Sequence, residues 1–290
     1  MTPFTYFQPA GLEEAFSLVA EHGPGTRLMA GGQSLLLALK ERLARPPTVV
    51  SLSRIPELSA ISYAEDGSLE VGAATTYAQL QKAAFTGWHR HISAIAGNLA
   101  DRSVRSMGTI GGGACQADPR YDVPTLLVAS AARMVIGSID GMRSIDAAAF
   151  FSPAGGTTLG PRDILCRIVF PPAGVFASFG FDKFRFRVFD AAVVNAALAV
   201  TTDEAGRITI ARLVFGGIAA CPSVAGAAGA RLCGVQLNEF ASLPVADIAA
   251  QASEEVLPIA TATTRHRQFQ SELIKTITTG LLTQAGAPGG

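Results

Sequence analysis

The chain has 290 residues, a formal net charge of zero and an isoelectric point near 6.9. The balanced charge excludes a protein that binds nucleic acid through a basic surface. Hydrophobic residues make up 49% of the chain and charged ones only 16%, so every region can contribute to a core. The thin charged coat reflects a high alanine and glycine content, or it indicates that other subunits cover part of the surface.

No stretch of the sequence approaches the ~20 apolar residues that span a membrane, and residues 1–4 lack the pattern of a signal peptide. We therefore expect a cytoplasmic protein with no membrane span. The four cysteines form no C-x-x-C pair and show no zinc or iron–sulfur spacing. We expect no disulfide framework and no metal site, so any iron–sulfur cluster that works with this chain belongs on another one.

The first 60 residues are expected to form a small β–loop–α–β unit. Apolar residues from Leu12 to Val19 recur at helical spacing, with acidic residues in the first turn and Gly23 after the end. The predicted elements that follow are a strand over 27–30, a glycine-rich segment, a helix from the N-cap Ser34 to about Leu43, and a strand over 48–52.

The middle of the chain is expected to combine hairpins with helices. Asp66-Gly67 and Asp140-Gly141 are tight-turn signals, each between two short strand-like runs. The predicted elements are a hairpin over 61–63 and 69–72, helices over 77–85 and 89–99, a second glycine-rich segment, a helix over 123–131, a hairpin over 133–136 and 142–145, and a strand over 163–170.

Pro171-Pro172 predicts a domain boundary. After it come three predicted strands, over 179–187, 192–202 and 207–216, and then helices from Ser223, the last over about 264–282. We expect residues 285–290 to be disordered. Strands and helices do not alternate regularly, so the fold class is α+β.

The first glycine-rich segment is Ala30-Gly31-Gly32-Gln33-Ser34-Leu35. Glycines at positive φ, without side chains, let backbone amides face a diphosphate. The Ser34 hydroxyl and the N-terminus of the following helix add to such a site. An ordinary strand-to-helix turn that needs glycine accounts for the same six residues.

The second segment offers Thr109 and Gly111–Gly113 for the same purpose, with Asp118 and Asp122 just beyond. Two such loops indicate one extended ligand held at two points. Short carboxylates in such places accept hydrogen bonds from a ribose or an amine edge. Alternatively, Asp118-Pro119 opens a turn and Asp122 caps the next helix.

Lys183 lies in an alternating aromatic and basic run, Phe181 to Arg187. Its cation either lies near an anionic ligand or electron-rich ring, or belongs to the solvated face of an amphipathic strand. No dinucleotide-binding G-x-G-x-x-G, Walker, H-E-x-x-H or G-x-S-x-G motif occurs. The four histidines are interpreted as structural or surface residues, and we name no catalytic residue and no metal ligand.

Taken together, these residues resemble the medium, flavin-binding subunit of the molybdenum hydroxylases, such as the carbon monoxide, nicotine and quinoline dehydrogenases, and the flavin region of xanthine dehydrogenase. The likeness covers nearly the whole chain in one order. It is carried by LMAGGQSLLLALKERLARPPTVVSLSRIPEL from Leu28, LEVGAATTYAQL from Leu69, VRSMGTIGGGACQADPRYDVPTLLVA from Val104, FDKFRFRVFDAAVVNAAL from Phe181 and FGGIAACP from Phe215.

The resemblance implies non-covalent FAD and a fold in two domains. Residues 1–172 would form a two-lobed FAD-binding domain of the p-cresol methylhydroxylase type, with lobes at about 1–56 and 57–172. Residues 173–290 would form a smaller C-terminal α+β domain, a three-stranded antiparallel sheet plus helices.

The resemblance also implies the cofactor contacts. The segment from Leu28 would wrap the pyrophosphate, Asp122 would contact the adenosine side, and Leu165 and Lys183 would lie near the isoalloxazine. The implied FAD-binding residues are Leu28, Met29, Ala30, Gly31, Gly32, Gln33, Ser34, Leu35, Thr76, Thr109, Ile110, Gly111, Gly112, Gly113, Asp118, Asp122, Leu165 and Lys183. Met107 stands where the family commonly has arginine, which removes a charged contact.

The implied function is an electron-transfer subunit of an oxidoreductase. Molybdopterin would sit on a large partner subunit and [2Fe-2S] clusters on a small one, in a dimer of heterotrimers. FAD on this chain would pass electrons to an external acceptor. One alternative is a free-standing FAD-dependent oxidoreductase of the same fold that acts directly on a small substrate. Another is a binding module that has lost its cofactor.

Overall fold

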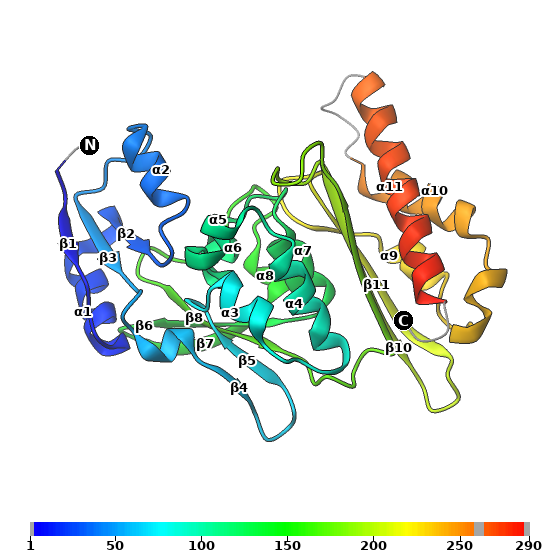
Figure 1. The fold of residues 1–290 in the computed structure, drawn as a ribbon, viewed down its shortest axis with the longest axis horizontal. Coiled ribbons are helices and arrows are strands. Elements are labelled where there is room, and N and C mark those ends of the chain that lie inside the picture. Colours follow the sequence, from blue (N-terminus) through cyan, green and yellow to red (C-terminus); the bar gives the residue numbers. More distant parts are fainter. Residues whose placement is uncertain (1–2, 258–263, 287–290) are drawn as a thin grey trace.

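The structure is a computed structural model that describes residues 3–257 and 264–286 (Figure 1). Three sheets follow one another along the long axis of the molecule, with helices packed against each of them. Each region has its own cluster of buried apolar side chains. The fold class is α+β, as predicted.

The N-terminal region is built on a three-stranded parallel sheet in the order β1-β3-β2. Helix α1 packs Ala15 and Val19 into its core, and the predicted Gly23 ends the helix at φ +69°. Helix α2 ends at Lys40 rather than at Leu43, because Arg42 takes a left-handed φ of +62°. The elements are β1 (Thr5–Phe7), α1 (Leu12–His22), β2 (Thr26–Met29), α2 (Leu35–Lys40) and β3 (Thr48–Ser51).

The middle region holds a five-stranded antiparallel sheet in the order β4-β5-β8-β6-β7. Both predicted hairpins are present, and Gly67 and Gly141 take the positive φ that their turns require. The strands are β4 (Ile61–Tyr63), β5 (Leu69–Gly72), β6 (Arg133–Ser138), β7 (Gly141–Asp146) and β8 (Ile164–Phe170). The helices are α3 (Tyr77–Lys82), α4 (Arg90–Gly97), α5 (Arg102–Met107), α6 (Ile110–Gln116), α7 (Asp122–Ala129) and α8 (Ala147–Phe150).

The C-terminal region has an antiparallel sheet in the order β12-β11-β10-β9, so a short fourth strand extends the three that were predicted. Its strands are β9 (Ser178–Phe184), β10 (Val194–Thr202), β11 (Ile208–Gly216) and β12 (Ser223–Val224). Its helices are α9 (Gly226–Ala230), α10 (Val245–Val256) and α11 (Thr264–Ala285). Of the segment expected to be disordered, Ala285 ends α11, whereas residues 287–290 lie outside the described residues.

Helix α7 joins the middle region to the C-terminal sheet. It packs on β10 and β11, while α11 covers β9 and β10. Strand β10 is therefore buried on both faces from Val194 to Val200, which explains its nearly continuous apolar sequence. The buried side-chain amide of Asn195 forms hydrogen bonds across this junction. Its Oδ1 accepts from Thr125 Oγ1 at 2.5 Å, and its Nδ2 donates to the carbonyls of Arg120 and Tyr121 at 3.3 Å.

Candidate functional site

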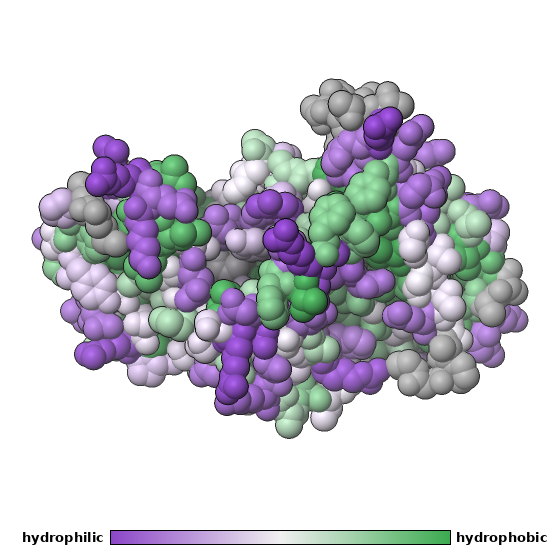
Figure 2. All heavy atoms as spheres, turned by 45° about the horizontal axis from the view of Figure 1, so that its top comes forward, coloured by the Kyte–Doolittle hydropathy of each residue, from purple (hydrophilic) through white to green (hydrophobic). Residues whose placement is uncertain are grey.

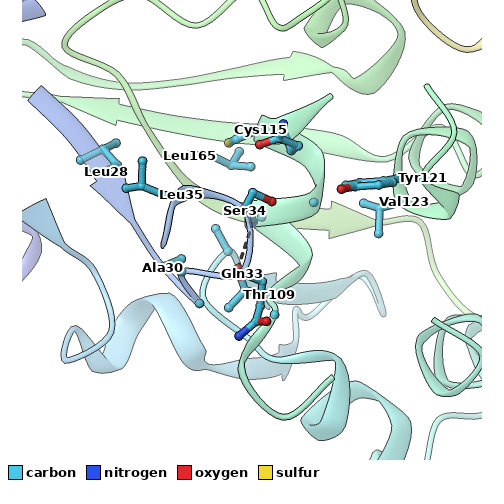
Figure 3. A pocket seen from close by; sticks show the side chains of 18 of the residues that line it. Leu28, Ala30, Gln33, Ser34, Leu35, Thr109, Cys115, Tyr121, Val123 and Leu165 are labelled. Carbon is cyan, nitrogen blue, oxygen red and sulfur yellow. Dashed lines mark hydrogen bonds between the residues drawn. The ribbon is translucent and has the colours of Figure 1, made fainter. Parts of the chain in front are cut away.

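A cavity of about 1120 Å³ lies where the N-terminal region, the middle region and β9 meet. Figure 2 shows the surface hollowed between the N-terminal part of the molecule and its centre. In the close-up of Figure 3, Leu28 and Leu35 line one side, Tyr121 and Val123 the other, and Ser34 and Thr109 lie between them. The volume exceeds the roughly 300–1,000 Å³ of most small-molecule pockets, so the cavity suits an extended ligand.

The first glycine-rich segment lies on this cavity with its amides unpaired. Within the described part of the chain, the N–H groups of Gly31, Gly32, Gln33 and Ser34 make no hydrogen bond. Gly32 has a φ of +71°, and a Cβ on Gly31 would lie 1.8 Å from the carbonyl oxygen of Met107. Both glycines are therefore required here, and together they leave a row of backbone donors that suits an anion.

Ser34 holds the predicted N-cap position of α2, but its side chain makes no capping hydrogen bond. The Leu36 amide donates instead to the carbonyl of Gly32, at 2.9 Å. The Ser34 hydroxyl is thus not used by the helix. It lines the cavity beside the unpaired amides.

The second glycine-rich segment behaves differently, because it is the first part of helix α6. Thr109 Oγ1 accepts from the Gly112 amide at 3.0 Å and caps the helix. Three further amides are also paired: Ile110 donates to Thr75, Gly111 to Ala73 and Gly113 to Thr109, all to carbonyl oxygens at 2.9–3.0 Å. The glycine amides of this segment are therefore committed to the protein, and only the Thr109 amide has no hydrogen bond among the described residues. The glycines allow close packing instead, since a Cβ on Gly111 would lie 2.5 Å from Ala73 O.

Asp122 and Lys183 form an ion pair at the edge of the cavity. Lys183 Nζ donates to Asp122 Oδ2 and, at 3.1 Å, to the carbonyl of Asn98. Their side chains are 8% and 3% exposed for Lys183 and Asp122, respectively. Burial raises the pKa of Asp122, and the Lys183 ammonium opposes that rise. The solvated-face interpretation of Lys183 is therefore wrong.

The capping interpretation of Asp122 is also wrong. Asp122 is the first residue of α7, Tyr121 takes the N-cap position, and no side chain caps this helix. Strand β9 ends at Phe184 rather than at Arg187, and Arg185 just beyond it donates to the side chain of Asn98 at 2.7 Å. The contacts of Lys183 and Arg185 thus tie the end of β9 to the α4–α5 connection.

Most of the predicted site residues share this one cavity. Those that line it are Leu28, Met29, Ala30, Gly31, Gly32, Gln33, Ser34, Leu35, Thr109, Gly111, Gly112, Gly113, Asp122, Leu165 and Lys183. Three do not. Thr76 caps α3, Ile110 is buried in the core, and Asp118 forms an ion pair with Arg120 at 2.7 Å that lowers the pKa of its carboxyl.

Asp118 also confirms the predicted turn, because its Oδ1 accepts from the Arg120 amide at 3.0 Å. Other cavity-lining residues were not predicted from the sequence, among them Tyr77, Cys115, Tyr121 and the segment 189–192. Tyr77 and Tyr121 lie at helix starts, Cys115 near the end of α6 and the segment 189–192 in a connection between strands, where no local pattern signals a ligand. An antiparallel bridge between Thr76 and Thr109 brings α3 to the cavity, and such long-range pairing leaves no local signal in the sequence.

Two further properties bear on the chemistry available here. In residues 3–257 and 264–286, no group of three or more His, Cys, Asp or Glu side chains is placed to hold a metal ion. Across the same ranges, no helix combines the length and apolar character needed to cross a membrane. All four cysteines are free thiols.

Comparison with known proteins finds relatives along nearly the whole chain. Residues 2–173 match the family described as the FAD binding domain in molybdopterin dehydrogenase, and residues 180–285 match the CO dehydrogenase flavoprotein C-terminal domain. The chain is 32% identical to the carbon monoxide dehydrogenase medium chain of Afipia carboxidovorans, over 87% of this chain and 86% of that one. It is 30% identical to the glyceraldehyde dehydrogenase medium chain of Sulfolobus acidocaldarius, over 95% of both.

A solved structure agrees with these relatives. The fold matches a chain of quinoline 2-oxidoreductase from Pseudomonas putida 86 with a TM-score of 0.84 and 30% identity, over 99% of this chain and 98% of that one. Sequence and fold thus point to the same group of proteins. The chain belongs to the family of FAD-binding medium subunits of the molybdenum hydroxylases.

Proposed function

We propose that the cavity binds FAD without a covalent link and that the unpaired amides of residues 31–34 hold its diphosphate. The chain is the flavoprotein subunit of a molybdopterin-dependent oxidoreductase. The observation that carries the proposed binding mode is the contrast between the two glycine-rich segments. Four amides of the first have no protein acceptor in the described structure, whereas the Ile110–Gly113 amides of the second are paired and only its Thr109 amide has no acceptor there.

The residues present fit this cofactor. The cavity has a volume of about 1120 Å³, and Gly31, Thr109 and Lys183 all line it. Apolar side chains such as Leu28 and Leu165 suit a flat aromatic ring system. Asp122 and Lys183 are in contact, so we propose that they face the same part of FAD rather than its two opposite ends. The proposed site is completed by Leu28–Leu35, Thr109, Gly111–Gly113 and Leu165. We propose that Thr76, Ile110 and Asp118, which do not line the cavity, hold these residues in position.

The protein's part in the mechanism is to bind and orient. Bound FAD supplies reversible electron transfer between carriers on partner subunits and an external acceptor. The loop amides balance the charge of a diphosphate, while Gly31 lets the loop approach α5 closely. Lys183 places its amino group at a buried position in an ion pair with Asp122, where it would lie beside a negatively charged neighbour. No side chain of this chain has to act as an acid or a base.

We propose partner subunits because the described residues form no group of side chains that could hold a metal ion or cluster. Molybdopterin and [2Fe-2S] clusters are proposed on a large and a small subunit, in a dimer of heterotrimers. The loop between β9 and β10 supports this, because Phe186, Val188 and Phe189 are 63–72% exposed there and Phe189 also lines the cavity. Such exposed apolar groups are typical of surfaces that another protein covers.

The domain limits and the compartment are also proposals. Residues 1–172 would form the FAD-binding domain, in lobes of about 1–56 and 57–172, and residues 173–290 the C-terminal domain. The family matches, which meet between 173 and 180, support this limit. Free thiols at all four cysteines support the cytoplasm, where thiols stay reduced.

Purification of this chain with the proteins that bind it tests the function. The expected result is a complex with two further subunits that contains FAD, molybdenum and iron, with FAD released on denaturation. Reduction of the flavin by a substrate should require the partner subunits. Reduction by substrate in the isolated chain would favour the free-standing oxidoreductase instead. A chain that stays colourless after FAD is added would favour the binding module.

A further inference from the structure

Tyr77 is a buried tyrosine whose position is fixed by its backbone. It is the first residue of α3 and is 8% exposed. Its N–H donates to the carbonyl of Gly108 at 2.9 Å, next to the bridge between Thr76 and Thr109. The ring consequently lies against the connection from α5 to α6, where a Cβ on Gly108 would be 3.1 Å from ring carbon Cε2.

The hydroxyl of Tyr77 fills the space that a side chain on Gly113 would need. A Cβ on Gly113 would lie 2.2 Å from Tyr77 Oη but 3.6 Å from Tyr77 Cζ. The second distance is ordinary van der Waals contact, so the hydroxyl oxygen alone excludes the side chain. Gly113 does not have a positive φ, which means that space rather than backbone conformation demands glycine here.

This hydroxyl has no protein partner. Within the two described ranges, Tyr77 Oη makes no hydrogen bond, although Tyr77, Gly113, Tyr121 and Asp122 all line the cavity. Burial raises the pKa of Tyr77, and the charges of Tyr121 and Asp122 act in the same direction. The hydroxyl therefore keeps its proton at neutral pH and is available as a donor towards the cavity.

We propose that the Tyr77 hydroxyl donates a hydrogen bond to an oxygen atom of bound FAD, and that Gly113 lacks a side chain because the hydroxyl occupies its place. This inference rests on the proposed function, since it takes FAD as the occupant. A hydroxyl that opens onto the cavity without a protein acceptor is free to donate to an oxygen of a ligand bound there. The ribityl, ribose and phosphate oxygens of a dinucleotide provide the acceptor that the protein does not.

The test is a titration of the full chain with FAD, followed by flavin fluorescence, for four variants. Tyr77→Phe keeps the ring and removes the hydroxyl, and we expect the dissociation constant for FAD to rise by about three- to tenfold. Tyr6→Phe, at an exposed tyrosine on β1, is the matched control and should bind FAD like the wild type. Gly113→Ser should bind FAD more weakly than the wild type, because its Cβ would lie 2.2 Å from the Tyr77 hydroxyl oxygen.

The double variant Tyr77→Phe/Gly113→Ser separates this role from a purely structural one. The phenylalanine ring leaves room for the new Cβ, and the serine hydroxyl lies close to the lost one. We expect it to bind FAD more tightly than either single variant. Equal affinity of Tyr77→Phe and wild type, with both folded by their urea midpoints, would overturn this inference while leaving FAD binding intact. Failure of the wild type to bind FAD would overturn the proposed function itself.

Discussion

Lys183, near the end of β9, donates to the carboxylate of Asp122, at the start of α7, and thereby joins the C-terminal sheet to the middle region beside the cavity. Both side chains are almost completely buried. Each charge depends on the other, because an isolated charge at such a depth is strongly disfavoured. The pair is thus a structural link between two regions as well as a wall of the proposed site.

Removal of the lysine should show this dependence. Lys183→Met is expected to lower the free energy of unfolding by about 3–5 kcal/mol, because Asp122 is left buried and unpaired. The double variant Asp122→Asn/Lys183→Met should recover much of that loss. Urea unfolding followed by circular dichroism gives all three values, and a double variant no more stable than the single one would contradict the pairing.

The same variant should acquire a characteristic pH dependence. Burial raises the pKa of Asp122, and without Lys183 only the more distant charge of Arg185 opposes that rise. The folded state then holds a proton that the unfolded state releases above its ordinary pKa of about 4, so stability falls as the pH rises from there. Urea midpoints of Lys183→Met and wild type between pH 4 and 8 should diverge progressively towards neutral pH.

Gly31 should be intolerant of any side chain. A Cβ in Gly31→Ala would lie 1.8 Å from Met107 O, so the loop must move away from α5 and its amides lose their alignment. We expect at least a tenfold loss of FAD affinity, about 1.4 kcal/mol. Gly174→Ala is the matched control, since a Cβ there meets nothing within 4 Å. Unchanged FAD binding in Gly31→Ala would show that the loop does not hold the cofactor.

Thr109 should contribute to stability through its hydroxyl. In Thr109→Val the Gly112 amide loses the oxygen that accepts from it at 3.0 Å, and the loss of an N-cap lowers stability by about 1 kcal/mol. Thr109→Ser keeps the oxygen and should remain within a few tenths of a kcal/mol of the wild type. Thermal unfolding in the absence of FAD distinguishes this effect from a change in cofactor binding.

Acid should destabilise the chain partly through His91. Burial lowers the pKa of His91 to about 4, with the neighbouring Arg90 acting in the same direction. Its ordinary value is about 6.5, so on acidification the unfolded chain takes up the proton first and stability falls between these two pH values. His91→Gln should flatten the unfolding free energy over that window. An unchanged slope in the variant would exclude His91 as the cause.

The sequence was sufficient to predict most helices and strands, because their apolar periodicity and their turn residues act locally. Gly23 and Asp66-Gly67 ended or turned their elements where expected. Helix α5 was not predicted, since it is short and has no buried residue that sets a period. The second glycine-rich segment was misjudged because glycine is a poor helix former, and only the Thr109 cap and contacts with β5 and the residues after it hold it as a helix.

Many of the residues that line the cavity were predictable, but their hydrogen bonds were not. Leu28–Leu35 and Gly111–Gly113 line the cavity as expected from sequence. Which amides are free is decided by acceptors far away in the chain, such as Ala73 O and Thr75 O for the α6 amides. The pairing of Asp122 with Lys183 likewise joins residues 61 positions apart, and no local pattern specifies it.

The cavity is walled by residues from all three regions, Leu28 from the first sheet, Leu165 from the second and Lys183 from the third. A ligand that binds only this folded arrangement stabilises all of it by mass action. The lifetime of the chain inside a cell should therefore depend on the supply of flavin. Chains made when riboflavin is scarce would open more often and be degraded sooner, so the amount of subunit would follow the amount of vitamin.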